Sequence, residues 1–413
     1  MTDNPMFDPK AFRLSNLESE LCAKVRDFGQ STLAPRAEKW DRDAVFPTEN
    51  YRDMATNGLL GICIPKESGG LGADYRAYCL AAAEMGRYCG ATALTWNMHV
   101  SSTLWTGSLL DTLEMSPQAK EAQDKRSTVH RKRILEDGAV YSQSFSEGGA
   151  AAAGAVAWGT LVKRTDKGWL LNGKKIFASL AGNANYYGVL CTDVTDGEPS
   201  RRNTLYLAVP ADAAGVSVVG DWDPLGMRGT VSRTLLFDNV IVDPVNELMP
   251  QGSYFEMAVG WPHMFLTLAP TYMGICQGAY DFTVKYLRGE YPGTPPVKRR
   301  MYPTKQIAVA EMLIKLEQTK ALWFQVISEA CYKPSKEQLL RAYAAQYTVM
   351  ENANDICRLA IRTCGGQSML KSLPLERMYR DSRCGALMLP WTSELCMDRI
   401  GHGALYEAGE KDD

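Results

Sequence analysis

The chain has 413 residues, of which 46% are hydrophobic and 22% charged, values typical of a folded globular protein. A chain of this length usually forms two or three domains. Its formal net charge of -2 provides no overall positive field, so a nucleic acid is not expected as the main partner.

Eleven cysteines are scattered singly along the chain, without a CxxC pair or a nearby histidine cluster, which argues against a metal site. We expect them to be reduced, buried thiols. No N-terminal signal segment is visible, and no apolar run reaches the length of a membrane span. These observations predict a cytoplasmic protein without a membrane segment.

Residues 1–138 show the apolar period of helices, for example at Leu17, Leu21, Val25 and Phe28. An N-terminal helical domain is therefore predicted. Two stretches, GICIPKESGGLGADY and WNMHVSSTLW, interrupt this period and are expected to be loops.

Residues 139–251 contain seven short segments rich in β-forming residues, separated by turn residues: AVYSQSF, GTLVKRT, GWLLNGKKIFASL, YYGVLCTD, TLYLAVP, VSVVGDW and SRTLLFDNVIV. Their spacing predicts a middle β domain, an antiparallel sandwich or barrel. Residues 252–413 return to the helical period, with long segments near 270–288, 304–331 and 336–363. A C-terminal helical bundle is predicted, interrupted by the proline-rich and basic loop RGEYPGTPPVKRRMYPTKQ.

Four segments resemble the successive signature blocks of the acyl-CoA dehydrogenase family: SFSEGGAAAAG, NGKKIFASLAGNANYY, DPLGMRGTVSRTLLFDNVIV and GGQSMLKSLPLERMYRDSR. The resemblance covers nearly the whole chain, and the blocks follow the family's order. It implies a helical, β, helical fold that binds FAD and oxidises or reduces its substrate.

The resemblance also implies cofactor contacts. Phe145 and Ser146 correspond to the loop along the flavin pyrimidine edge, and Phe177 and Ser179 to the segment beside the reactive part of the ring. An aromatic face and a hydroxyl donor suit a flavin ring. The alternative for Phe177 is an ordinary core position in the sheet.

Five further residues correspond to family positions that contact the FAD diphosphate and adenosine, in part from a neighbouring subunit: Arg300, Gly365, Gly366, Thr392 and Glu394. Glycine permits close approach of the backbone to the dinucleotide. A homodimer or homotetramer is therefore expected. The alternative for Arg300 is a solvated loop position within KRRMYP.

The positions implied for catalysis and CoA binding are altered together. The family removes an α-proton with a glutamate, but Pro390 and Met264 occupy its two customary positions. Phe265 stands where a charged residue normally lies near CoA, and Ala152 and Ala153 replace the serine and aspartate of the middle loop. No catalytic residue is assigned.

Four residues are candidates for a relocated base: His263, Glu394, Glu256 and His99. His263 is preferred because an imidazole titrates near neutrality and because it neighbours one customary position. The alternative is a satisfied core histidine. Trp391 can form either the wall of a substrate pocket or part of the core.

Three functions remain open. The first is FAD-dependent α,β-dehydrogenation of an unusual acyl-CoA, with an electron acceptor protein or oxygen as oxidant. The second is a flavin-dependent monooxygenase or oxidase on the same fold. The third is a non-oxidative thioester lyase, or an inactive partner subunit.

Overall fold

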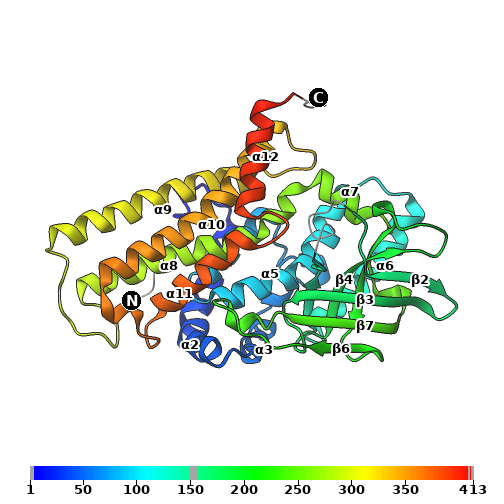
Figure 1. Cartoon of the computed structure of the whole chain (residues 1–413), viewed down its shortest axis with the longest axis horizontal. Helices are drawn as coiled ribbons and strands as arrows, with labels where there is room; N and C mark the ends of the chain where they lie inside the picture. The colour runs from blue at the N-terminus through cyan, green and yellow to red at the C-terminus, as the bar shows by residue number, and fades with distance from the viewer. Residues whose placement is uncertain (1–3, 149–155, 408–409, 411–413) are drawn as a thin grey trace.

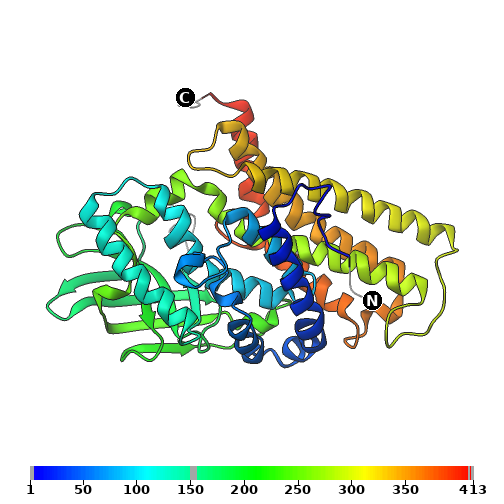
Figure 2. The same ribbon diagram turned by 180° about the vertical axis from the view of Figure 1, so that it is seen from behind.

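The computed structural model describes residues 4–148, 156–407 and 410. The β-sheet occupies one end of the molecule and the long C-terminal helices occupy the other (Figure 1). The N-terminal helices lie between them, as the view from behind shows (Figure 2). Ala152 and Ala153 lie outside the described residues.

The N-terminal helices begin and end at clear sequence signals. Ser15 and Glu18 form a reciprocal capping box at the start of α1, which buries Leu21, Val25 and Phe28. Helix α4 packs against α1 and against the later helix α8. The helices before the sheet are α1 (Asn16–Phe28), α2 (Ala34–Asp43), α3 (Thr48–Thr56), α4 (Tyr75–Gly86), α5 (Gly90–Leu104) and α6 (Pro117–Leu135).

The stretch WNMHVSSTLW is not a loop, contrary to the sequence prediction. Most of it continues α5, followed by a π-helical turn at Trp105–Leu109 in which Gly107 leaves helical geometry. Ser101 Oγ and Ser102 Oγ donate to the carbonyls of Asn97 and His99, at 2.8 and 2.6 Å. These bonds satisfy the buried hydroxyl groups within the helix, and burial in the tertiary structure overrides a weak local propensity.

The strands form one mixed sheet. Its order is β6-β7-β3-β2-β4-β5-β8, and β1 pairs with β4. The pairs β1–β4 and β2–β4 are parallel. The sequence prediction of an antiparallel sheet is therefore wrong for these two pairs. The strands are β1 (Tyr141–Ser144), β2 (Leu161–Thr165), β3 (Gly168–Ala178), β4 (Tyr186–Asp193), β5 (Thr204–Pro210), β6 (Val216–Val219), β7 (Arg233–Val242) and β8 (Glu247–Met249).

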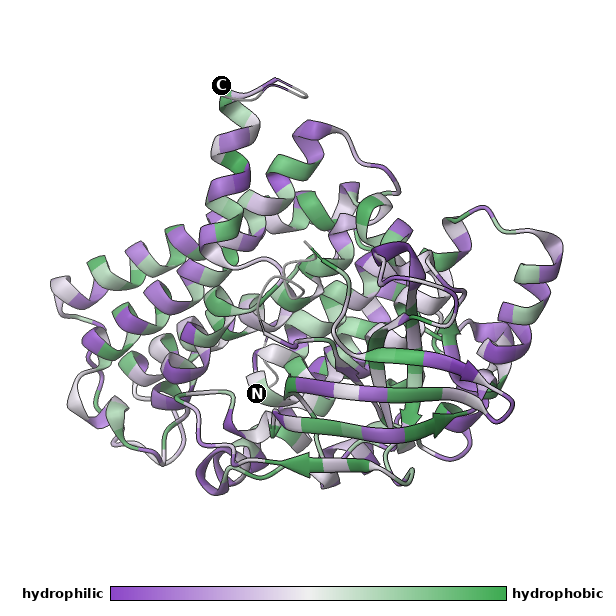
Figure 3. Cartoon of the chain, turned by 45° about the vertical axis from the view of Figure 1, so that its right-hand side comes forward, coloured by the Kyte–Doolittle hydropathy of each residue, from purple (hydrophilic) through white to green (hydrophobic). Residues whose placement is uncertain are grey.

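The C-terminal helices form a bundle in which α10 contacts α8, α9, α11 and α12. Hydrophobic and hydrophilic residues alternate along α9 and α10, as amphipathic helices require (Figure 3). Ser335 and Gln338 form a second capping box, at the start of α10. The helices are α7 (Ser253–Gly260), a 3₁₀ segment (Pro262–Leu268), α8 (Ala269–Arg288), α9 (Pro303–Glu329), α10 (Lys336–Cys364), α11 (Pro374–Cys384) and α12 (Ser393–Leu405).

A polar junction joins the three regions at α11. Arg380 Nη2 lies 2.5 Å from Asp41 Oδ2 of α2, and the Met227 amide donates to Asp381 Oδ1 at 2.5 Å. Arg228 Nε also donates to the Asp41 carbonyl at 3.0 Å. Burial, and secondarily the nearby Asp41 charge, raises the pKa of Asp381 to about 6. This junction fixes the helices relative to the sheet.

Candidate functional site

The segment after β1 is fastened to β3. The Ile176 amide donates to the Ser146 carbonyl at 2.7 Å, and Lys175 Nζ donates to the Phe145 carbonyl at 3.2 Å. Phe177 follows one residue further along β3. The structure thus brings together the two segments that were predicted to contact the flavin ring.

A buried ion pair lies beneath these segments. Lys175, with no exposed side-chain surface, places Nζ 2.6 Å from Glu147 Oε1 and 4.6 Å from the centre of the Trp158 ring. Glu147 also accepts hydrogen bonds from the amides of Gly159 and Thr160, at 2.7 and 2.9 Å. Burial lowers the pKa of Lys175 to about 8 despite the Glu147 charge. Burial alone would raise the pKa of Glu147, but Lys175 and the hydrogen bonds lower it overall.

Phe177 has an unusually open position for a large apolar residue. Its backbone has a φ of 50°, and 68% of its surface is exposed. Among the described residues, the aromatic ring that meets it is that of Trp222, edge-on at 6.3 Å between centres. The interpretation of Phe177 as a core residue is therefore wrong.

Ser179 belongs to a buried chain of hydroxyl groups. Its Oγ lies 2.8 Å from Ser232 Oγ, which lies 2.7 Å from Thr230 Oγ1. The Trp222 Nε1 atom, next to Phe177, is buried without a hydrogen-bond partner. Donors for a polar ligand edge are thus present beside an open aromatic face.

A set of four aromatic rings, here called the ring set, connects the three regions. It consists of Phe145, Trp105, Phe265 and Trp391. Ring centres are 6.0 Å apart for Phe145–Trp105, 6.2 Å for Trp105–Phe265 and 6.0 Å for Phe265–Trp391. Trp105 and Trp391 are buried, whereas Phe145 and Phe265 are half-buried. The ring set extends from the β1 loop to the C-terminal helices.

The two customary glutamate positions border this ring set. Met264 precedes Phe265 and is fully buried, and Pro390 precedes Trp391 and is half-buried. Both positions are therefore apolar and lie next to an aromatic residue of the set. Neither the methionine nor the proline side chain can itself accept the proton.

His263 is buried, and both ring nitrogens lack a hydrogen-bond partner. Burial lowers its pKa to about 4, an effect that Glu329 partly opposes, so the ring is neutral at pH 7. The Tyr75 hydroxyl donates to its backbone carbonyl at 2.8 Å. Because residues two apart on a 3₁₀ helix point about 120° apart, His263 and Phe265 face different directions.

The other base candidates have other surroundings. His99 Nδ1 accepts from the Tyr141 amide at 3.0 Å, so Nε2 donates to the Leu60 carbonyl at 2.9 Å. Both nitrogens of His99 are therefore engaged with the backbone. Glu256 and Glu394 are exposed residues.

The positions predicted for the dinucleotide are on the C-terminal helices. Gly365 has a φ of 83°, and a Cβ at Gly365 or Gly366 would meet no atom within 4 Å. Thr392 Oγ1 caps α12 by accepting from the Leu395 amide, and Arg300 is exposed. None of the contacts between described residues joins these positions to Phe177.

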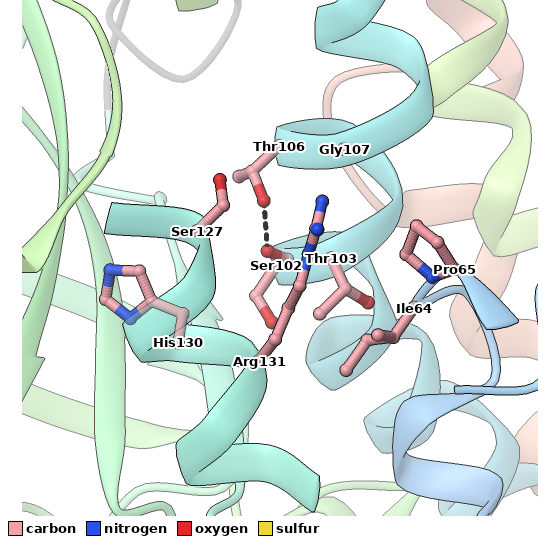
Figure 4. A pocket seen from close by; sticks show the side chains of 9 residues that line it. All are labelled: Ile64, Pro65, Ser102, Thr103, Thr106, Gly107, Ser127, His130 and Arg131. Atoms are coloured by element: carbon pink, nitrogen blue, oxygen red, sulfur yellow. Dashed lines mark hydrogen bonds between the residues drawn. The ribbon is translucent and has the colours of Figure 1, made fainter. Parts of the chain in front are cut away.

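Two clefts among the described residues contain none of the predicted cofactor residues. The smaller, between α5 and α6, has room for about one water molecule and is lined by Ser102, Thr103, Thr106 and Arg131 (Figure 4). The larger, of about 480 Å³, lies beside Tyr75, Arg76 and Trp261.

The β-side residues fit a flavin. Phe177 offers an uncovered aromatic face, while Trp222 Nε1 offers a donor without a partner. Open space around Gly365 and Gly366 leaves their backbone accessible to a dinucleotide. An apolar face with a few fixed donors is what a flavin ring requires of a protein.

Fold and site together define a flavoprotein with helical, β and helical regions in sequence. Three domain profiles match the chain in order: acyl-CoA dehydrogenase N-terminal domain at residues 15–109, middle domain at 144–240 and C-terminal domain at 263–404. The chain belongs to the acyl-CoA dehydrogenase family.

Known relatives cover most of the chain. The acryloyl-CoA reductase (NADH) of Anaerotignum propionicum is 28% identical, with 90% of each chain aligned. The 3-(aryl)acrylate reductase of Clostridium sporogenes is 29% identical, over 90% of this chain and 94% of its own. The solved dibenzothiophene monooxygenase of Paenibacillus sp. A11-2 shares the fold, with a TM-score of 0.76, 20% identity and 94% and 97% coverage.

The family relationship confirms the predicted cofactor and enzyme class: the chain is an FAD-dependent oxidoreductase. Within the described residues, no helix is long and apolar enough to cross a membrane. Nor do those residues contain a cluster of side chains that could hold a metal ion.

Several residues at the site were not singled out from the sequence. Lys175 had a signal, since a lysine amid the apolar residues of a strand needs a partner. Trp222 is the last residue of the segment VSVVGDW, and no pattern distinguishes it there. Trp105 was assigned to a loop, so its contact with Phe145 could not be anticipated.

Proposed function

We propose that this chain acts on the carbon–carbon bond next to the carbonyl group of an unusual acyl substrate, as a dehydrogenase or, in the reverse direction, a reductase. One observation carries the proposal: Phe265 and Trp391 each follow a customary glutamate position, and their rings are in contact. An aromatic wall thus occupies the region where the family places its base and CoA-binding charges.

The protein's own residues have distinct tasks in this proposal. Phe145 and Phe177 supply apolar faces, and Ser179 and Trp222 supply donors at the ring edge. FAD, when bound, accepts or supplies a hydride. The ring set excludes water and contacts an apolar acyl group.

The aromatic wall favours a substrate with a bulky or aryl-substituted acyl group over one with a straight chain. Aromatic rings prefer offset or edge-on contacts with one another, and these favour an aryl ligand over a flexible alkyl one. The relative named 3-(aryl)acrylate reductase is consistent with this choice.

An anaerobic titration tests the proposal. Purified protein with oxidised flavin is mixed with aryl-substituted acyl-CoAs, the matching free acids and straight-chain acyl-CoAs, and the flavin absorbance is followed. We expect an aryl-substituted compound to bleach the flavin. Equal bleaching by straight-chain acyl-CoAs would contradict the aromatic preference, and no bleaching by any compound would contradict the reaction.

His263 is the candidate for a relocated base, because His99 is engaged with the backbone and Glu256 and Glu394 are exposed. Its neutral ring has two free nitrogens, and its low pKa predicts a flat rate of flavin reduction between pH 5.5 and 8. His263→Gln should slow this step at least about tenfold, a conservative part of what a general base contributes. An unchanged rate would exclude His263 as the base. This result would agree with the observation that His263 and Phe265 face different directions.

A flavin-dependent monooxygenase is the second candidate. The ring set and both customary glutamate positions lack an ionisable side chain, and oxygenation needs no α-proton acceptor. The experiment mixes reduced protein with oxygen and an apolar aromatic compound. Oxygen consumption coupled to an oxygenated product would support this candidate. If no acyl compound bleaches the flavin and no oxygenated product forms, the remaining hypothesis is a non-oxidative thioester lyase or an inactive partner subunit.

A second copy of the chain is the expected partner, as a homodimer or homotetramer. The Gly365–Gly366 turn is followed by Met369 and Leu370, whose surfaces are 63% and 52% exposed. We expect Met369→Lys to weaken assembly and FAD retention together, measured by sedimentation and absorbance. An electron acceptor protein or oxygen would complete the reaction.

A further inference from the structure

Lys175 makes three contacts beneath the segments that face the flavin in the proposed site. Its Nζ reaches Glu147 Oε1 at 2.6 Å and the Phe145 carbonyl at 3.2 Å, and lies 4.6 Å from the Trp158 ring centre. The adjacent Ile176 amide holds the Ser146 carbonyl. Two consecutive β3 residues thus bind two consecutive residues of the β1 loop.

Such a buried charge is costly unless it is fully paired. Here the pairing is complete, because Glu147 accepts from Lys175 and also from the backbone amides of Gly159 and Thr160. Removing the ammonium would leave the Phe145 carbonyl and a buried carboxylate without their donor. The β1 loop would then lose its attachment at Phe145, and Glu147 would lose the charge that neutralises it while keeping the two backbone amides.

We propose that Lys175 is a positioning residue, which holds Phe145 and Ser146 at a fixed distance from Phe177 and so sets the shape of the flavin site. This inference rests on the proposed function only in assigning these segments to the flavin ring. It does not depend on the substrate or on the base. Lys175 itself acts through the loop and does not touch the reacting atoms.

The test compares Lys175→Met with the matched control Lys315→Met, which breaks the more exposed Lys315–Asp355 ion pair of α9 and α10. Both are made in the full chain. FAD dissociation constant, flavin reduction potential and the visible absorption and circular dichroism bands are measured, with the urea midpoint of the FAD-free protein. We expect Lys175→Met to weaken FAD binding at least tenfold and to shift the potential and bands. Lys315→Met should leave all flavin readouts unchanged.

Glu147→Gln is a second variant, because it keeps an oxygen for the backbone amides while removing the charge. It should produce the same spectral change to a smaller degree. If both variants bind FAD normally, with unchanged potential and bands, the proposal is wrong, even where the urea midpoint falls. Altered FAD binding in Lys175→Met, with no bleaching of the wild type by any acyl compound, would uphold this inference and overturn only the proposed reaction.

Discussion

The two sides of the site differ in how their residues are held. On the β side, Phe145 and Ser146 are fixed to β3, next to Phe177, by hydrogen bonds and by the buried Lys175–Glu147 pair. On the helical side, Phe265 and Trp391 are held mainly by ring packing, and Gln346 Nε2 also donates to the Trp391 carbonyl at 3.2 Å. Polar networks demand specific partners, whereas packed aromatic surfaces accept many apolar shapes. The β side can therefore keep one cofactor while the helical side adapts to another substrate.

The largest effect is expected on the helical side, where removal of the Trp391 ring should destabilise the fold. Trp391 is 2% exposed and meets Tyr343 at 4.7 Å between ring centres. Trp391→Ala should lower the free energy of unfolding by about 3–5 kcal/mol, because it leaves a cavity. Urea denaturation measures the change. Leu389→Ala, at a residue 40% exposed, should change it by about 0.5 kcal/mol at most.

The polar junction at α11 contains a buried carboxyl group, Asp381, whose contribution to stability should depend on pH. Asp381 has a pKa of about 6 in the folded protein, above its value in the unfolded chain. The folded state therefore binds the proton more tightly, so this carboxyl reduces stability as pH rises from about 4 to 6. Asp381→Asn should abolish this pH-dependent loss of unfolding free energy, which amounts to up to about 3 kcal/mol.

Unfolding free energies at pH 4, 5, 6 and 7 measure the slope. Asp355→Asn removes a more exposed carboxylate of α10 and serves as the control. An identical slope in wild type and Asp381→Asn would show that the buried carboxyl does not titrate in this range.

A glutamate introduced at residue 390 tests whether the helical side lacks only the customary base or has also lost productive acyl-CoA binding. Pro390 is half-buried and borders the ring set, so a glutamate there can reach it. Pro390→Glu should raise the rate of flavin reduction by acyl-CoA about 100-fold, the lower range for a general base. Stopped-flow absorbance measures the rate, with Pro390→Gln as control. Equal rates in the two variants would mean that the acyl-CoA no longer binds productively.

The smallest effect is expected from a single hydroxyl on the β side. Ser179→Ala removes one end of the Ser179–Ser232–Thr230 chain. It should weaken FAD binding by about 1 kcal/mol, the usual contribution of one hydrogen bond. Fluorescence titration with FAD measures this change. Ser217→Ala on exposed β6 is the control and should have no effect.

Much of the fold follows from local signals. The helical periods and the seven β-rich segments lie where the sequence indicates them. The parallel pairing of β4 could not be predicted, because it joins strands distant in the chain. Similarly, the helical end of α5 depends on burial and internal hydrogen bonds around His99 and Ser101.

The sequence by itself determined the family, the FAD cofactor and the absence of glutamate at residues 264 and 390, because these depend on residue identity and order. Only the tertiary structure decided what surrounds those positions. Contacts between Phe145, Trp105, Phe265 and Trp391 join residues up to 160 positions apart along the chain. The direction of His263 and the partners of Lys175 likewise depend on how distant segments pack, which no local pattern records.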